Sequence, residues 1–324
     1  MNQQAERSSN IISDFIESYF ERRMARILLL GMISGFPWVL IASSLSLWLK
    51  EEGLSRSTIG WAGLIFAVYG FNWLWAPLID RLRVPVLTDR LGHRKAWILI
   101  LQALILVCIL FWSTIDPVSS LALVIGAGLV IAICSATQDI TIDALRIEQI
   151  DKDDARGMAA GAAVAVVGWW SGYKLGGMAA LFMADYLETA GVANYWQMTF
   201  IFLAVLVVLC NIGLLFIPET GTRERAEGQR QAQQAMADRM GGAGPVVQLV
   251  SFLTTTVIEP LWSFFRKNGM QIGIMILAFL FLFKIGEAFM GKMSIVFYKE
   301  VGFSKSDIAI YSKGLGWITT VVFT

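Results

Sequence analysis

The sequence is dominated by apolar runs, each long enough to cross a lipid bilayer. A helix needs about 20 apolar residues to span the hydrocarbon core. Backbone amides inside lipid must be paired within the chain, and an open sheet edge cannot face lipid, so these runs are expected to be helical. The sequence therefore predicts an all-α membrane protein. Seven runs and the start of an eighth occur at Ile27–Leu49, Thr58–Ile79, Ala96–Ile115, Ser119–Leu145, Gly157–Ala184, Trp196–Ile217, Met270–Tyr298 and from Ser306 onward.

The composition agrees with a membrane protein and excludes several other classes. Of the 324 residues, 56% are hydrophobic and 16% are charged, whereas about a quarter of the residues of a soluble domain are charged. The formal net charge of +1 indicates no nucleic-acid partner. The three cysteines lie inside apolar runs without the spacing of metal ligands, and no nucleophile-base pair or phosphate-binding loop is evident. We therefore expect no metal site, no cofactor and no enzymatic activity.

Basic residues are distributed unevenly among the loops. With the N-terminus in the cytoplasm, 18 of the 26 lysines and arginines fall on the cytoplasmic side. Cytoplasmic loops carry the excess of Lys and Arg in membrane proteins, so this orientation is predicted. The outer loops hold Lys50, Arg56, Lys299 and Lys305, and the spans hold Lys174, Lys284, Lys292 and Lys313.

One phrase of the sequence occurs twice. KEEGLSRSTIG, at Lys50–Gly60, returns as KEVGFSKSDIA, at Lys299–Ala309, at an offset of 249 residues. Both copies join two spans on the outer side, as expected for two parallel six-helix repeats related about an axis along the membrane normal. Alternatively, the phrase is only an outer turn followed by a helix cap at Ser57 or Ser306.

The repeat and the polar stretches divide the chain into four segments. At the repeat offset, Thr324 corresponds to Trp75 inside span two, so the second repeat is expected to be incomplete in this chain. A cytoplasmic amphipathic segment is expected at residues 1–26. A first six-helix bundle is expected at residues 27–218. A polar cytoplasmic linker with an amphipathic helix (219–269) and the start of a second bundle (270–324) are expected to follow.

Carboxylates inside the spans mark candidate sites for proton coupling, because an ionisable residue in lipid is costly unless it faces a cavity or a partner. Asp139 and Asp143 are four residues apart on one face of span four. Burial and mutual repulsion disfavour two negative charges there, and a group that readily gains a proton can carry one. Glu287 in span seven is a further candidate. Alternatively, Asp143 pairs with Arg146 or Arg156 in a structural network.

Lysines in the outer half of the spans favour a substrate that carries carboxylates. Lys174, Lys284, Lys292 and Lys313 would together give an outer cavity surplus positive charge, although Lys284 can also pair with Glu287 on the same helix face. Alternatively, Lys292 and Lys313 extend to the outer interface, which leaves them outside the site.

Aromatic residues near the middle of the spans offer faces on which a sugar ring can stack. Trp38 follows a Gly-Phe-Pro break in span one, and Tyr173 lies in span five. The alternative is that these rings face lipid or its interface. Close to Tyr173, the spacing of Gly168, Gly172 and Gly176 predicts tight packing of span five on another helix.

Four motifs resemble those of one transporter family. Ala76–Arg81 reads APLIDR and Leu91–Lys95 reads LGHRK, which resembles the loop between spans two and three of the major facilitator superfamily. Ser135–Asp139, SATQD, and Phe283–Phe289, FKIGEAF, resemble the more specific motifs of the AmpG-type muropeptide permeases, with Glu287 in place of an aspartate. The resemblance covers nearly the whole chain from about residue 25.

This resemblance implies a secondary importer in the bacterial inner membrane. Its substrates would be anhydro-muropeptides, namely GlcNAc-anhydroMurNAc and its peptides, carried from periplasm to cytoplasm with protons by alternating access. Gln138, within the span-four motif, joins the candidate substrate residues. Alternatives are a transporter of another anionic solute, such as an acyl-CoA-like molecule, or a non-transporting membrane sensor with the same fold.

The resemblance also implies a cytoplasmic gate in the loop between spans two and three. Its candidate residues are Asp80, Arg81, Arg94 and Lys95. Asp80 can pair with either Arg94 or Lys95 near the inner surface. Breaking such a pair would cost little free energy once water can reach it.

Overall fold

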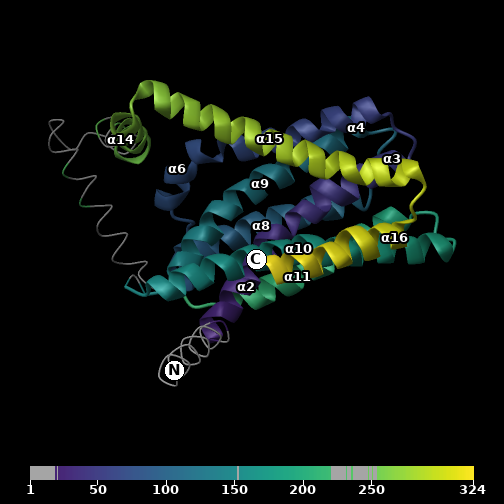
Figure 1. Cartoon of the computed structure of the whole chain (residues 1–324), viewed down its shortest axis with the longest axis horizontal. Helices are drawn as coiled ribbons and strands as arrows, with labels where there is room; N and C mark the ends of the chain where they lie inside the picture. The colour runs from purple at the N-terminus through teal and green to yellow at the C-terminus, as the bar shows by residue number, and fades with distance from the viewer. Residues whose placement is uncertain are drawn as a thin grey trace, which may run out of the picture.

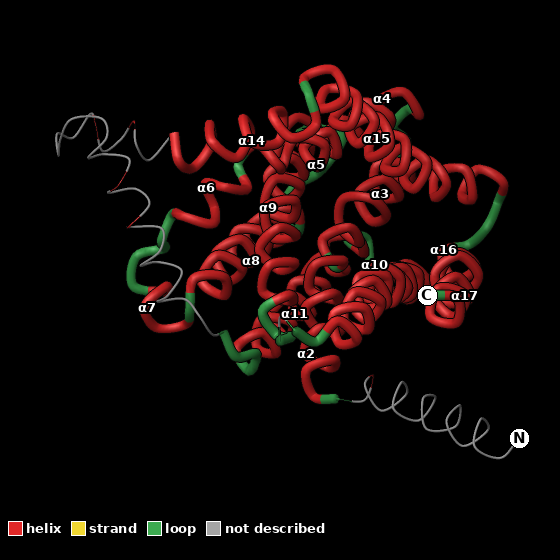
Figure 2. Tube along the Cα trace, turned by 60° about the vertical axis from the view of Figure 1, so that its left-hand side comes forward, coloured by secondary structure: helices red, strands yellow, loops and turns green. Residues whose placement is uncertain are grey.

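The structure is a computed structural model that describes residues 21–151, 153–219 and 254–324. It also describes five isolated positions: Tyr19, Gln231, Ala235, Val247 and Val250. Within these residues the chain is helical and contains no strand, as the sequence predicts (Figures 1 and 2). The N-terminal amphipathic segment, apart from its last residues, and most of the linker lie outside the described residues.

The helices follow the predicted spans in order. Among the described residues, five helices are long and apolar enough to cross a membrane: Arg22–Glu51, His93–Trp112, Leu121–Ile147, Tyr195–Leu215 and Met270–Val301. The first of them comprises α2 (Arg22–Gly35), the π-helical η1 (Val39–Ser44) and α3 (Leu45–Glu51). The others are α8 (His93–Trp112), α9 (Leu121–Ile147), α11 (Tyr195–Leu215) and α15 (Met270–Val301). The predicted fifth span is α10 (Ala155–Thr189).

The predicted second span is not one regular helix. It is divided into α4 (Arg56–Ala62), η2 (Gly63–Ala67), α5 (Val68–Phe71), η3 (Asn72–Leu74) and α6 (Ala76–Arg81), with η2 and η3 in the tighter 3₁₀ form. Its glycines permit close approach of α15, because a Cβ on Gly70 would lie 2.5 Å from the ring of Phe281. A short helix, α7 (Leu87–Leu91), follows before α8.

The remaining helices belong to the end of the linker and to the spans that follow it. They are η4 (Thr254–Ile258), α14 (Glu259–Asn268), α15, α16 (Lys305–Asp307), η5 (Ile308–Leu315) and α17 (Gly316–Phe323). Helix α15 packs on α3, η2 and α5, whereas η5 and α17 pack on α10 (Figures 1 and 2). The two C-terminal spans therefore lie against different parts of the first six.

The two copies of the repeated phrase have the same local structure. Gly53 and Gly302, which correspond at the repeat offset, have φ of +83° and +103°, a conformation that favours glycine. Each turn is followed by a serine cap: Ser55 accepts from the Thr58 N–H and Ser304 from the Asp307 N–H. The caps are thus not Ser57 and Ser306, as one alternative expected, but the serines two residues earlier.

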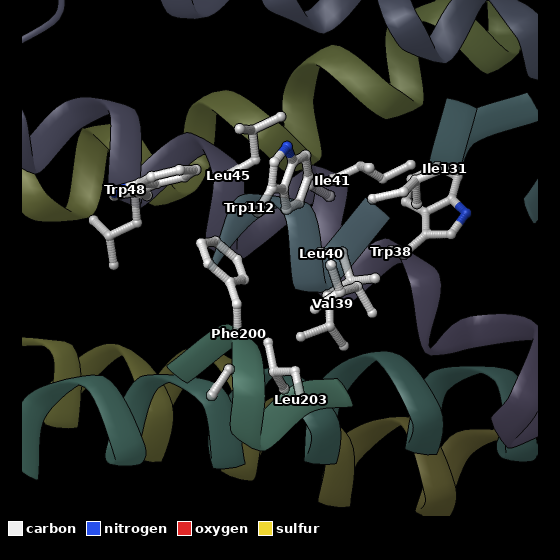
Figure 3. Close-up of a cluster of buried hydrophobic side chains, with 14 of the residues drawn as sticks. Trp38, Val39, Leu40, Ile41, Leu45, Trp48, Trp112, Ile131, Phe200 and Leu203 are labelled. Carbon is white, nitrogen blue, oxygen red and sulfur yellow. The ribbon is translucent and has the colours of Figure 1, made fainter. Parts of the chain in front are cut away.

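The core of the first six spans is apolar and aromatic. Figure 3 shows Trp48, Trp112 and Phe200 meeting in it, with ring centroids of Trp48 and Phe200 5.0 Å apart. Helices α2 and α10 cross closely beside this core, because Gly168 and Gly172 place only hydrogen atoms against the backbone of α2. The predicted tight packing of span five is confirmed at these two glycines.

Candidate functional site

A cavity of about 320 Å³ lies between α2, α9 and α10. Ser34 of α2, Asp139 and Asp143 of α9, and Trp169 of α10 contribute to its wall. The cavity occupies the half of α9 that leads towards Asp80, and we call that end of the molecule the Asp80 end. The opposite end, where span one finishes, is called the Glu51 end.

The two carboxylates of α9 have different surroundings. The Ser34 hydroxyl donates a hydrogen bond of 2.5 Å to Asp139 Oδ1. Asp143 lies 3.4 Å from Arg146 Nη2, and its side chain is 68% exposed. Asp143 therefore has the arginine partner that one sequence-based alternative expected. Asp139, at the cavity wall, therefore has a neutral hydroxyl as its partner, whereas Asp143 has a cation.

Gln138 is completely buried, and its amide group ties three helices together. Its Oε1 accepts a hydrogen bond of 2.7 Å from Gln102 of α8, and its Nε2 donates one of 2.9 Å to the carbonyl of Ile33 in α2. Both the oxygen and the nitrogen of the amide are therefore hydrogen-bonded to other helices. Gln138 stabilises the packing of these helices and does not line the cavity described above.

Trp38 lies in an aromatic cluster at the junction of spans one, two and five. Its ring centroid is 4.9 Å from Phe66, 5.1 Å from Tyr69, 5.4 Å from Trp169 and 6.4 Å from Tyr173. Trp38 is only 7% exposed and so does not face lipid. Trp38 and Tyr173, which the sequence placed in separate spans, are thus brought together.

A lysine of the eighth span also enters this cluster. Lys313 of η5 is buried, and its Nζ lies 3.8 Å from the centroid of the Tyr173 ring and 3.5 Å from Ser43 Oγ of η1. Its position contradicts the alternative in which Lys313 extends to the outer interface. Because Lys313 lies inside an apolar run, the sequence marks it as unusual. The sequence could not show that Tyr173, in another span, is its partner.

The other three lysines that were expected in the outer cavity have separate environments. Lys174 Nζ lies 5.2 Å from the ring centroid of Trp170. Lys284 forms an ion pair of 2.9 Å with Glu287, with both side chains more than two-fifths exposed. Lys292 is 1% exposed, and its ammonium makes no hydrogen bond within the described residues. Lys292 therefore does not reach an outer interface, which rules out that alternative for this conformation.

Arg94 connects three spans at the Asp80 end. Its Nη1 lies 3.1 Å from Asp80 Oδ1, and its Nε lies 2.6 Å from Glu148 Oε1 just beyond α9. Of the two partners that the sequence allowed for Asp80, the structure has Arg94. The carboxylate of Glu219 accepts hydrogen bonds of 2.9 Å from the backbone N–H groups of Arg94 and Lys95, so it caps the start of α8.

Arg81, the neighbour of Asp80, reaches a different part of the chain. It donates hydrogen bonds to Thr255 of η4, 2.5 Å to the hydroxyl and 2.8 Å to the carbonyl. Lys95 is largely buried. Through Thr255, Arg81 joins the second span to the C-terminal part of the linker.

The sequence pattern of the Major Facilitator Superfamily matches residues 27–324. The chain belongs to the major facilitator superfamily. The predicted family and the predicted all-α membrane fold are therefore confirmed. The match covers the cavity, the aromatic cluster and both copies of the repeated phrase, so all of these lie within the superfamily fold.

Curated relatives narrow the similarity within this superfamily. The chain is 31% identical over 300 residues to a protein of Rickettsia conorii named putative transporter AmpG 4, covering 93% of this chain and 65% of the relative. It is 32% identical over 313 residues to the anhydromuropeptide permease of Escherichia coli, covering 96% of this chain and 55% of the relative. The chain thus spans somewhat over half the length of these relatives. The names confirm the predicted resemblance to AmpG-type permeases.

Proposed function

We propose that this chain belongs to a secondary importer that carries anhydro-muropeptides from periplasm to cytoplasm together with protons. The observation that carries the proposal is the 32% identity, over 96% of the chain, to a permease named for anhydromuropeptides. The motifs in spans four and seven support it, since they are the ones that resemble the permeases specifically. Transport rather than catalysis fits the family, whose members named above are transporters or permeases.

Alternating access would be the mechanism. Residues 27–218 would form one bundle and residues from 270 would begin the second, with residues 219–269 as the linker. The Asp80 end would face the cytoplasm, in agreement with the 18 of 26 basic residues that this orientation places inside. The protein would then be a multi-pass protein of the bacterial inner membrane with a cytoplasmic N-terminus.

Asp139 would be the main proton-coupling residue. Its support is the cavity beside it and the hydrogen bond from Ser34, a partner that carries no charge and can serve either protonation state of the carboxylate. Asp143 and Glu287 would contribute less, because Arg146 and Lys284 already pair with them.

Substrate binding would draw on the aromatic cluster and the lysines. Trp38 and Tyr173 would contact the sugar rings, and Lys292 would bind a carboxylate, since its buried ammonium has no hydrogen-bond partner within the described residues. Lys174 and Lys284 would add positive charge around the site. Gln138 would have to leave Gln102 to contact substrate directly. Its present contacts favour a supporting role.

The charges at the Asp80 end would act as a cytoplasmic gate. Arg94 would hold Asp80 and Glu148, Arg81 would hold the C-terminal part of the linker through Thr255, and Lys95 would lie beside them. The Asp80 side chain is 45% exposed, so its pair with Arg94 should cost about 1 kcal/mol or less to break, whereas the more buried Arg94–Glu148 pair should cost more.

The test is uptake of a labelled anhydro-muropeptide into membrane vesicles that contain the complete protein. The vesicles are measured with an inward proton gradient and after its collapse by an uncoupler. Accumulation that depends on the gradient is expected. Uptake of an acyl-CoA-like anion, without uptake of the muropeptide, would contradict the proposed substrate. Uptake of neither compound would support the alternative of a non-transporting membrane sensor.

A further inference from the structure

The two copies of the repeated phrase bind each other through their shared Lys-Glu pair. Lys50 Nζ of the first copy lies 2.7 Å from Glu300 Oε1 of the second. Lys299 Nζ of the second copy lies 2.9 Å from Glu51 Oε1 of the first. Lys50 and Lys299 correspond at the offset of 249, as do Glu51 and Glu300. The lysine of each copy therefore pairs with the glutamate of the other.

A second cation in each copy also pairs with the glutamate of the other copy. Arg56 Nε lies 2.6 Å from Glu300 Oε1, and Lys305 Nζ lies 3.0 Å from Glu51 Oε1. Arg56 and Lys305 also correspond at the offset of 249. Each glutamate thus binds both cations of the other copy. We call this group the repeat clamp; its members are Lys50, Glu51, Arg56, Lys299, Glu300 and Lys305.

The two halves of the clamp differ in burial. The pairs around Glu300 are partly exposed to solvent, since the Arg56 side chain is 72% exposed. Around Glu51 the pairs are more buried, because Lys305 is 0% and Glu51 is 9% exposed, although Lys299 is 30% exposed. Lys305 Nζ also lies 2.5 Å from Glu188 Oε2 of α10. Glu51 Oε2 also accepts hydrogen bonds from Tyr195 and Trp196. A buried charge that loses its partner costs several kcal/mol, whereas a wet pair costs little to break.

We propose that the repeat clamp is the gate of the Glu51 end, which holds the ends of the two repeats together and separates when this end opens. Its four ion pairs all join residues before Ser57 to residues after Tyr298, so they bridge the repeats rather than strengthen one of them. Ion pairs suit this task because water can replace them without repacking a core.

The clamp explains why the chain keeps one short phrase in two places. In a pair of bundles related by a two-fold axis, a Lys-Glu pair near the axis meets its own copy with opposite charges facing. A single sequence pattern then supplies both sides of the contact. The gate rests on the alternating access proposed above, but it does not depend on the identity of the substrate.

The gate is tested by the accessibility of a thiol that lies behind it. Ser43 is buried and contacts Lys313 of η5, so it lies between the repeats. Ser43→Cys is introduced into the complete protein with the native cysteines replaced by alanine. Right-side-out vesicles are then treated with a membrane-impermeant thiol reagent. Val118→Cys, at a position that is 60% exposed in the loop between α8 and α9, serves as the control thiol.

Removing one charge should open the gate. Glu300→Gln is expected to raise labelling of the Ser43→Cys thiol about two- to fivefold, as for loss of partly exposed ion pairs. Glu51→Gln is expected to raise it further, because that half of the clamp is buried. Labelling of the Val118→Cys thiol should not change. Unchanged labelling of the Ser43→Cys thiol in Glu300→Gln would overturn the proposal, even if Glu51→Gln fails to fold.

Charge inversion provides the matched control. Glu300→Lys alone places three cations together and should raise labelling. The triple variant Lys50→Glu, Arg56→Glu and Glu300→Lys reverses every charge of that half and should return labelling towards the parent value. Labelling in the triple variant as high as in Glu300→Lys would overturn the gate. Because no substrate is present, failure of muropeptide uptake would leave this result unaffected.

Discussion

The ammonium of Lys313 lies 3.8 Å from the centroid of the Tyr173 ring, so a cation of η5 is held against an aromatic face of α10. A cation over an aromatic face is attracted by the ring quadrupole, by about 2 kcal/mol when both groups are shielded from water. Both residues are buried here. This contact therefore helps to hold the eighth span against the fifth.

Tyr173→Leu should lower stability through loss of this contact. We expect the free energy of unfolding to fall by about 1 to 2 kcal/mol, measured as a lower Tm of the purified protein in detergent. Tyr173→Phe keeps the ring and should retain most of the stability. In a Lys313→Met background, Tyr173→Leu should cost less, and an equal cost in both backgrounds would show that the two residues are not coupled.

Asp139→Asn should abolish proton-driven accumulation but leave exchange of substrate across the membrane intact. With one proton carried per solute, a gradient of one pH unit supports about tenfold accumulation, and without coupling the ratio falls to about one. The measurement is the accumulation ratio in vesicles, beside counterflow of preloaded substrate. Asp143→Asn is the matched control and should have a smaller effect, since Arg146 already pairs with Asp143. Loss of counterflow as well would indicate a structural role for Asp139.

Lys292→Met should weaken binding of an anionic substrate more than Lys284→Gln does. The ammonium of Lys292 is buried without a hydrogen-bond partner among the described residues, whereas Lys284 already pairs with Glu287. A hydrogen bond to a charged group contributes about 1.5 to 3 kcal/mol. The half-saturation concentration should therefore rise about 10- to 100-fold for Lys292→Met and less for Lys284→Gln. An equal half-saturation concentration for the parent and for Lys292→Met would show that Lys292 does not bind the substrate.

What the sequence could predict was determined by distance along the chain. Span positions follow from runs of apolar residues, and the Lys284–Glu287 pair follows from a spacing of three within one helix. Contacts between distant spans carry no such local signal. The sequence therefore placed Lys305 in an outer loop, whereas the structure buries it beside Glu51.

The motif around Gln138 illustrates a second limit. A motif indicates that a residue type matters at a position, but not which atoms its side chain meets. The amide of Gln138 is divided between Gln102 and the Ile33 carbonyl, and both partners come from other helices. Likewise, the repeated phrase predicted two related loops, but only the fold shows that their Lys-Glu pairs face each other.

Trp38→Leu should weaken sugar-bearing substrates more than a bare peptide. The aromatic cluster around Trp38 offers ring faces for a sugar, while a peptide would rely on the lysines. Competition against labelled muropeptide uptake would measure both ligands on the same variant, and Trp38→Phe, which keeps a ring, is the control. Because Trp38 also packs on Phe66 and Tyr69, a lower Tm is expected. An equal loss of affinity for both ligands would argue against stacking.

Gly172→Val should disrupt the crossing of α2 and α10. A Cβ at Gly172 would collide with the backbone of Met32, which cannot move aside as a flexible side chain can. Such overpacking costs about 1 to 3 kcal/mol, so a lower Tm is expected. Gly291→Ala in α15 is the matched control, because an added Cβ there meets nothing within 4 Å. That variant should be stabilised by about 0.5 to 1 kcal/mol, since glycine is unfavourable within a helix. A parent-like Tm for Gly172→Val would mean that the two helices do not pack as described.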